Sequence, residues 1–160
     1  MIKVSIIALG HLKESYLKEA ASEYVKRLSA FCKLHITEIN PVKPTDNPNP
    51  AEIKSALNSE ADKILSIIPN SAYIIPLCIE GKLLSSEEFS QKIDSLAVLG
   101  KSHICFIIGS SYGLSDRVKE RADLKLSMSP MTFPHQLARI MLLEQVYRAF
   151  KISQGGTYHK

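Results

Sequence analysis

Hydrophobic and polar positions along the chain follow two alternating periods. Runs that are continuously apolar, or that alternate residue by residue, predict strands at 2–8, 34–39, 72–79, 103–108 and 124–128. Between these runs, apolar residues at helical spacing predict helices at 15–29, from 50 to about 68, from 86 to about 99, a short one after Ser115, and a long one that begins near Pro134. The strict alternation of strand and helix predicts an α/β fold: a mostly parallel sheet of about five strands in three layers. The whole chain, residues 1–160, is expected to form a single domain.

Polar residues mark the expected starts of the helices. Asn49 precedes Pro50 with Glu52 at the third helical position, Ser85 and Glu88 have the spacing of a capping box, and Ser115 precedes Asp116. The segment 41–50 contains four prolines and predicts an irregular connection. Pro76 removes one ladder hydrogen bond from its strand, so an irregular strand end is expected there, followed by a turn at 80–82.

Composition places the chain among ordinary globular proteins. Hydrophobic residues make up 45% and charged residues 22%. The apolar run at the N-terminus is too short for a membrane span and has no cleavage site, so a cytoplasmic protein without a membrane partner is expected. Cys32, Cys78 and Cys105 stand singly in or beside apolar segments, a pattern that favours buried thiols and argues against a metal site.

Most of the net charge of +4 lies near the C-terminus. Residues 131–160 contain Arg139, Arg148, Lys151 and Lys160 against Glu144 as the one acidic residue. An excess of cations in one region can attract a polyanion such as RNA. A solvated helix face would produce the same excess, so charge alone does not decide between the two.

A glycine loop, residues 109–114, follows one of the buried strands. Glycines at a strand end allow a ligand to approach the backbone and leave amides available as donors. The sequence GSSYGL matches neither the dinucleotide fingerprint nor the phosphate-binding loop, so nothing in it indicates NAD or ATP. A plain strand-to-helix turn remains an alternative, because such turns often need glycine.

A second strand end carries the loop MSPMTF, residues 128–133. Its methionine and phenylalanine side chains are suited to enclosing a flat ring whose polar edge is recognised by backbone groups. The alternative is that Met131 and Phe133 attach the following helix to the core. In parallel sheets ligands bind beyond the carboxyl ends of strands, so the two loops together form the best candidate for a site.

The final helix is apolar around nearly its whole circumference, which predicts a central position or a subunit interface. His135 and Arg139 share one side of it, while Glu144 and Arg148 lie roughly opposite, at the spacing of a local salt bridge. The tail ends in Tyr158, His159 and Lys160, which combine an aromatic ring, a titratable group and a cation suited to a nucleotide. Terminal residues are also commonly frayed.

Four stretches carry a family resemblance. LLSSEEF, FIIGSSYGL, LSMSPMTFPHQLARIMLLEQVYRAFKI and the terminal YHK resemble the RlmH family of SPOUT methyltransferases over essentially the whole chain. The resemblance implies an α/β knot fold with a C-terminal trefoil knot, a homodimer and S-adenosyl-L-methionine (SAM) as methyl donor. It also implies N3-methylation of a pseudouridine in 23S ribosomal RNA. Because a chain of 160 residues has little surface for reading a base sequence, we expect it to recognise the assembled ribosome.

The resemblance also implies roles for individual residues. The cofactor-binding positions are Leu77, Gly109, Met128, Ser129, Pro130, Met131, Thr132 and Phe133. We expect His159 or Tyr158 to touch the base, His135 or Glu144 to assist loss of the N3 proton, and Arg139, Arg148 and Lys160 to hold RNA phosphates.

The chain departs from the family pattern at two positions. Ser110 stands where the family has a second glycine, and Thr157 where it more often has proline. A side chain at Ser110 is expected to narrow the pocket or to oppose a positive φ angle. Two alternatives follow: a ribosome-associated factor that has lost catalysis, and a methyltransferase acting on transfer RNA.

Overall fold

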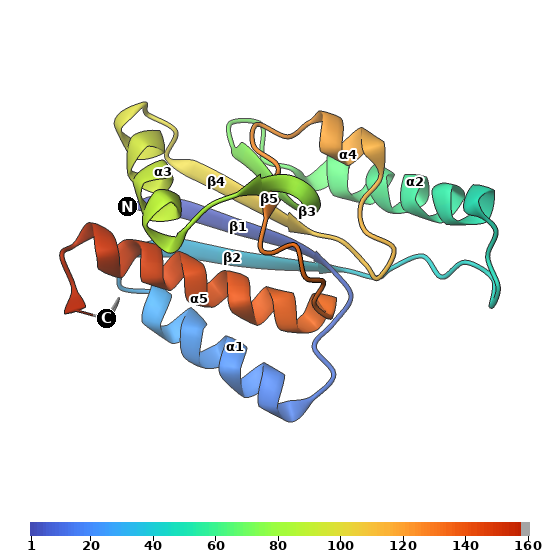
Figure 1. The fold of residues 1–160 in the computed structure, drawn as a ribbon, viewed down its shortest axis with the longest axis horizontal. Coiled ribbons are helices and arrows are strands. Elements are labelled where there is room, and N and C mark those ends of the chain that lie inside the picture. Colours follow the sequence, from blue (N-terminus) through green and yellow to red (C-terminus); the bar gives the residue numbers. More distant parts are fainter. Residues whose placement is uncertain (158–160) are drawn as a thin grey trace.

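A five-stranded parallel sheet with strand order β2-β1-β4-β3-β5 forms the centre of the molecule (Figure 1). The structure is a computed structural model, and it describes residues 1–157. Strands and helices alternate as the sequence predicts: β1 (Ile2–Leu9), α1 (Ser15–Leu28), β2 (Cys32–Ile39), α2 (Pro50–Ile67), β3 (Tyr73–Leu83), α3 (Ser86–Val98), β4 (His103–Ile108), α4 (Asp116–Glu120), β5 (Leu126–Ser127) and α5 (His135–Ser153).

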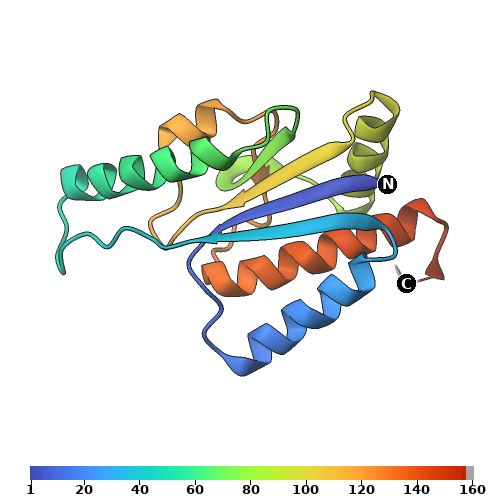
Figure 2. The same ribbon diagram turned by 180° about the vertical axis from the view of Figure 1, so that it is seen from behind.

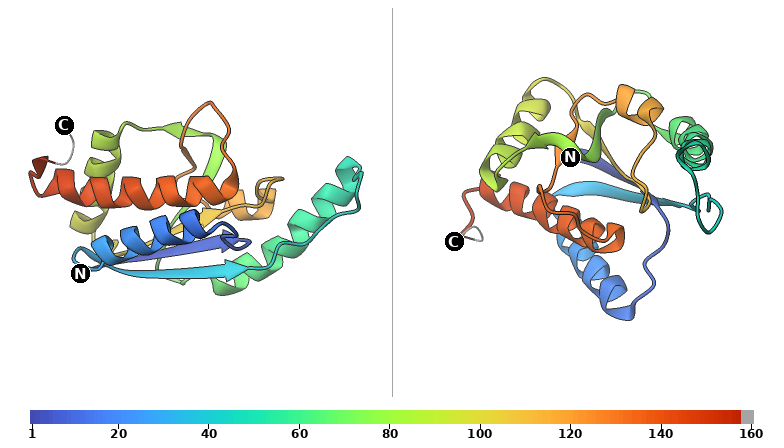
Figure 3. Two further views of the ribbon diagram at one scale, coloured as in Figure 1. Left: turned by 90° about the horizontal axis from the view of Figure 1, so that it is seen from below. Right: turned by 45° about the vertical axis from the view of Figure 1, so that its right-hand side comes forward.

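Helices cover both faces of the sheet, which makes three layers and confirms the predicted architecture (Figure 3). Alternate residues of β1 separate the two cores: Val4, Ile6 and Ala8 pack with α1, α3 and α5, whereas Ile7 and Leu9 pack with α2 and α4. Seen from behind, α2 runs past the end of the strands (Figure 2).

The predicted helix starts have the expected local bonds. The side chain of Asn49 accepts a hydrogen bond from the amide of Glu52, and Ser85 and Glu88 form a reciprocal capping box. Ser115 accepts from the amide of Arg117 at the start of α4. These three helices, α2, α3 and α4, therefore begin where a side chain satisfies an amide that has no partner inside the helix.

β3 is irregular where Pro76 predicts it to be. Its pairing with β4 ends at Pro76, and its register with β5 shifts between Leu77 and Lys82. The predicted turn at 80–82 is wrong, because β3 continues to Leu83 and Lys82 pairs with Leu126. Gly81 misled the prediction: the backbone of β5 comes within 2.8 Å of the place where its Cβ would be, so this glycine allows close strand packing.

α5 packs against α1 and α3, and every position from 138 to 152 is at least partly buried. This agrees with the apolar circumference of the helix. The trefoil knot that the resemblance implies stays a prediction. In the part of the chain that the structure describes, no helix is long and apolar enough to cross a membrane, and no cluster of His, Cys, Asp and Glu is arranged to hold a metal ion.

Candidate functional site

A pocket of about 610 Å³ lies beyond the carboxyl ends of β3, β4 and β5. These strands are neighbours in the sheet and run in parallel, so the loops that follow them converge at one edge. The structure brings together all of the residues expected to bind the cofactor except Pro130; lining the pocket are Leu77, Gly109, Met128, Ser129, Met131, Thr132 and Phe133.

The glycine loop forms one wall of the pocket and is folded tightly on itself. A Cβ on Gly109 would lie 2.4 Å from the carbonyl oxygen of Gly113, and Gly113 has a φ of +85°. The amide of Gly113 donates to the carbonyl of Ser110 over 2.9 Å, which closes the turn. Gly109 and Gly113 are thus required by backbone packing and by conformation respectively.

Ser110 fits this loop without strain. Among the described residues every positive φ belongs to a glycine, so the backbone of Ser110 does not adopt the conformation that opposes a side chain. Its hydroxyl donates to Glu60 on α2 over 3.3 Å. The departure from the family pattern at this position therefore imposes no backbone strain, while the serine side chain lies on the lining of the pocket.

The loop 128–133 forms the opposite wall and exposes apolar side chains. Met131 is 73% exposed and Phe133 is 37% exposed, so neither attaches the helix to the core, and that alternative is rejected. The loop is shaped locally, because the Ser129 hydroxyl accepts from the amide of Met131 and the Ser127 hydroxyl donates to the carbonyl of Ser129. Exposed apolar side chains over a pocket are typical of a site for a flat ring.

The rim of the pocket carries an ion pair that sequence analysis missed. Lys119 on α4 donates to Glu80 of β3 over 2.6 Å, and both residues line the pocket. The hydrogen bond from Lys119 lowers the pKa of Glu80, and the same bond raises the pKa of Lys119. Nothing in the local sequence indicates this pair, because it joins a strand end to a helix far along the chain.

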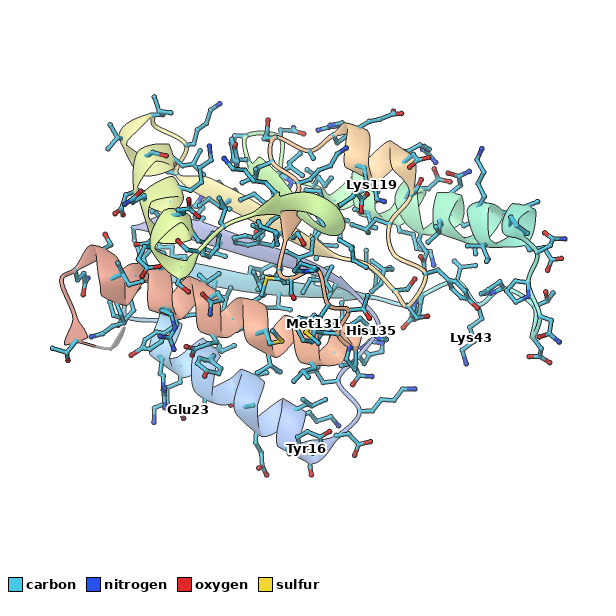
Figure 4. All side chains as sticks on the ribbon, in the orientation of Figure 1. Tyr16, Glu23, Lys43, Lys119, Met131 and His135 are labelled. Atoms are coloured by element: carbon cyan, nitrogen blue, oxygen red, sulfur yellow. The ribbon has the colours of Figure 1, made fainter. Side chains whose placement is uncertain are left out.

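His135, the first residue of α5, also lines the pocket and lies beside Met131 (Figure 4). Burial lowers its pKa, and the positive charges of Arg139 and Lys13 lower it further. The imidazole is therefore neutral at pH 7 and has one ring nitrogen able to accept a proton.

Arg139 is only 3% exposed, and both terminal nitrogens of its guanidinium make hydrogen bonds inside the protein. It donates to Glu38 over 2.6 Å and to the carbonyl of Gly10 over 2.9 Å, while its Nε has no partner among the described residues. Burial opposes ionisation of Glu38, but the hydrogen bonds from Arg139 and His11 outweigh it and lower the pKa of Glu38. A guanidinium buried in this way is not placed to bind an RNA phosphate, so the expected RNA contact of Arg139 does not fit the structure.

Glu144 and Arg148 form the local salt bridge that their spacing predicts, with Arg148 donating over 2.7 and 3.0 Å. Glu144 lines a second pocket of about 490 Å³ between α1, α3 and α5, together with Tyr24, Ser85 and Gln145. This pocket shares Ser127 and Met128 with the first one but does not contain His135. Of the other residues expected to act on the substrate, Tyr158, His159 and Lys160 lie outside the described residues.

Comparisons with known proteins agree on one family. A family model described as "Predicted SPOUT methyltransferase" matches residues 2–159. The protein named ribosomal RNA large subunit methyltransferase H from Clostridium acetobutylicum is 52% identical over 159 residues, which are 99% of this chain and 100% of that protein. Its namesake from Bacillus pumilus is 50% identical with the same coverage.

A solved structure is similar in fold. The structure of a probable methylase family protein from Haemophilus influenzae Rd KW20 superimposes with a TM-score of 0.54 at 14% identity. The similarity covers 100% of this chain and 72% of that one.

Proposed function

The chain belongs to the SPOUT methyltransferases, in the family of the ribosomal RNA large subunit methyltransferase H proteins, and we propose that it methylates N3 of a pseudouridine in 23S ribosomal RNA. The full-length match to relatives that are named for the large ribosomal subunit supports this class of substrate. Ribosomes are in the cytoplasm of bacteria, which is where the protein would act.

The methyl donor we propose is SAM, bound in the pocket at the ends of β3, β4 and β5. The observation that carries this proposal is the convergence of the glycine loop and the loop 128–133 on one pocket of about 610 Å³, large enough for a nucleoside with an amino-acid side arm. The residues present fit this group: Met131 and Phe133 offer apolar surface to the adenine, and the tightly turned backbone at Gly109 allows close approach. When bound, SAM supplies an electrophilic methyl group on its sulfonium.

The protein must also help N3 of the base to lose its proton, and His135 is suited to accept it. Its imidazole lines the donor pocket and is neutral at pH 7, as a base must be before it takes up a proton. Glu144 is the second candidate, acting from the neighbouring pocket where Arg148 holds its carboxylate. We propose further that Tyr158 or His159 contacts the base.

We propose that Arg148 and Lys160 hold RNA phosphates, and Arg139 is left out because its guanidinium is buried. Arg148 is half-buried, and its side chain remains partly exposed beside Glu144. The proposed target is the shaped surface of an assembled ribosome, because double-stranded RNA is recognised mostly by its shape and its backbone.

A homodimer through α1 and α5 is part of the proposal. Leu137 on α5 is 41% exposed and Tyr16 on α1 is 65% exposed, and Tyr16 points away from the rest of the molecule (Figure 4). Large apolar side chains that are exposed on neighbouring helices are typical of an interface. Sedimentation of wild-type protein and of Leu137→Glu tests this: we expect a dimer and a monomer respectively, and a wild-type monomer contradicts the interface.

The decisive experiment offers labelled SAM with four substrates in parallel: unmethylated ribosomes, isolated large subunits, naked ribosomal RNA and transfer RNA. We expect label in intact ribosomes, at N3 of a pseudouridine when the RNA is digested and analysed by mass spectrometry. Equal label in naked RNA contradicts recognition of the assembled particle, and label in transfer RNA alone moves the target. No label with SAM still bound would favour the non-catalytic alternative.

A further inference from the structure

The structure contains a buried carboxylate, Glu60, that the proposed chemistry does not use. Glu60 lies on α2 and is 3% exposed. One of its oxygens accepts from the hydroxyl of Ser110 over 3.3 Å, and the other accepts from the amide of Val42 over 2.9 Å. A single side chain thus connects α2, the irregular segment after β2 and the glycine loop of the donor pocket.

The glycine loop needs such an external contact to have a defined position. It is closed internally by the bond between the Gly113 amide and the Ser110 carbonyl, and by the packing of Gly109 against Gly113. A loop that is rigid within itself can still move as a unit between β4 and α4 unless other elements hold it. Ser110 supplies that contact at the start of the loop, where the loop borders the pocket.

Keeping a carboxylate at this buried place is costly, which argues that its contacts matter. Burial raises the pKa of Glu60, and the bonds from Val42 and Ser110 oppose this shift without cancelling it. At 3.3 Å the hydrogen bond from the Ser110 hydroxyl is a long one, so its contribution is modest beside that of the 2.9 Å bond from the Val42 amide. The serine at position 110 therefore has a specific partner, and a second glycine there would offer no hydroxyl to Glu60.

We propose that Glu60 is a positioning residue for methyl-donor binding, which holds the glycine loop through the Ser110 hydroxyl in the arrangement that SAM requires. This inference rests on the proposed donor site. Breaking the contact lets the loop sample other positions, and the apparent dissociation constant rises as the competent fraction falls. Once SAM is bound the loop is back in place, so the maximal rate at saturating SAM changes little.

Three substitutions and a matched control test the proposal by calorimetric titration with SAM and with S-adenosylhomocysteine. We expect Glu60→Ala to raise Kd by about tenfold, because the carboxylate that accepts from Ser110 is lost. Ser110→Ala should raise Kd by about threefold, because the donating hydroxyl is lost. Glu60→Gln should stay near wild type, since its amide can accept from Val42 and donate to the Ser110 oxygen. The double variant should be no worse than Glu60→Ala alone.

The control is Asp62→Ala, which breaks the 2.7 Å ion pair between Asp62 and Arg117. That pair joins α2 to α4, the helix that follows the glycine loop, and does not touch the loop itself, so Kd should not change. Unchanged Kd in both Ser110→Ala and Glu60→Ala, or an equal rise in Asp62→Ala, overturns the proposal. Ser110→Ala removes one partly buried hydroxyl, so this variant is expected to fold. Its Kd tests the proposal even if Glu60→Ala fails to fold.

Hydrogen exchange of the amides at 109–114 without ligand gives a second readout: faster exchange is expected in Ser110→Ala than in wild type, and equal exchange contradicts the proposal. Failure of wild-type protein to bind SAM overturns the donor site itself, and this inference with it. Wild-type binding with unaffected variants overturns the inference alone.

Discussion

Arg139 and Arg148 belong to the same helix, α5, and each donates to a glutamate, but the two pairs are held together in different ways. Arg148 pairs with Glu144 one turn earlier on the same helix and stays partly exposed. Arg139 is buried and reaches Glu38 at the end of β2 and the carbonyl of Gly10 after β1. The first pair is local, whereas the second fastens the start of α5 to the ends of two neighbouring strands, β1 and the edge strand β2.

The difference explains how the pocket wall at the start of α5 is stabilised. Pro134 provides no side-chain cap, and the first turn has no acidic residue. Contacts with the segment after β1 take over this role, since Gln136 accepts from the amide of Lys13 and Arg139 donates to Gly10. The position of His135 in the donor pocket therefore depends on tertiary contacts made by its neighbours on the helix.

Truncation of each arginine gives the largest predicted contrast. Arg139→Ala leaves the Glu38 carboxylate and the Gly10 carbonyl without their donor, and should lower the free energy of unfolding by about 3 kcal/mol. Arg148→Ala removes an i,i+4 pair and should lower it by about 1 kcal/mol or less. Urea unfolding followed by circular dichroism measures both. Equal losses would contradict the contrast between a tertiary and a local pair.

Replacing the glutamate of each pair by glutamine should have the opposite ranking in activity: the larger loss of methyl transfer is expected for the local pair. Glu144→Gln keeps the shape of the side chain but removes its charge, so methyl transfer should fall by about tenfold or more if Glu144 assists the proton, with little change in unfolding. Glu38→Gln should lower the unfolding free energy and leave the maximal rate of the folded enzyme largely intact. Single-turnover methyl transfer to ribosomes separates the two effects. It is measured roughly 20 °C below the melting temperature of each variant, so that both variants stay folded. A fully active Glu144→Gln would leave His135 as the candidate base.

The contrast between the arginines also shows what the sequence can and cannot predict. Spacing alone predicts the Glu144–Arg148 pair, because residues one turn apart on a helix meet whatever the rest of the chain does. Arg139 and Glu38 are 101 residues apart in the sequence. They meet only because β1 and β2 are adjacent in the sheet and α5 begins beside their ends. Neither the charge of Arg139 nor the family resemblance therefore indicates that its guanidinium is buried, because the burial depends on the packed fold.

The donor pocket was predictable for a related reason. Strand ends that are followed by glycine or by apolar loops can be located by periodicity, and parallel pairing then forces those loops to one edge. The loop 128–133 is found in this way, and the family resemblance adds Leu77 and the expected role of these residues in binding a methyl donor. The contacts of Glu60 with Ser110 and of Lys119 with Glu80 were missed, because they join elements whose relative position depends on the packed sheet.

Acid should weaken the buried pair selectively. The pKa of Glu38 is lowered in the folded protein, so its pair contributes stability above the pKa of an unfolded glutamate, about 4.3, and loses it as pH falls through the lower folded value. The difference in unfolding free energy between wild type and Glu38→Gln should therefore be largest near neutral pH and shrink below about pH 4.3. Urea titrations across this range measure it. A difference that is constant with pH would show that the charge of Glu38 is not what matters.

The smallest expected effect concerns His11, the exposed third member of the Arg139 network. Hydrogen bonds with Asn40 and Glu38 raise the pKa of His11, so its protonated form adds stability below the unfolded value of about 6.5, and this contribution is lost as pH rises through the folded pKa. His11→Gln should therefore lower the melting temperature slightly at acidic pH and leave it unchanged at alkaline pH. Scanning calorimetry resolves the difference. An effect that persists at alkaline pH would mean that His11 supports Glu38 through packing, and that the network consists of Arg139 and Glu38 alone.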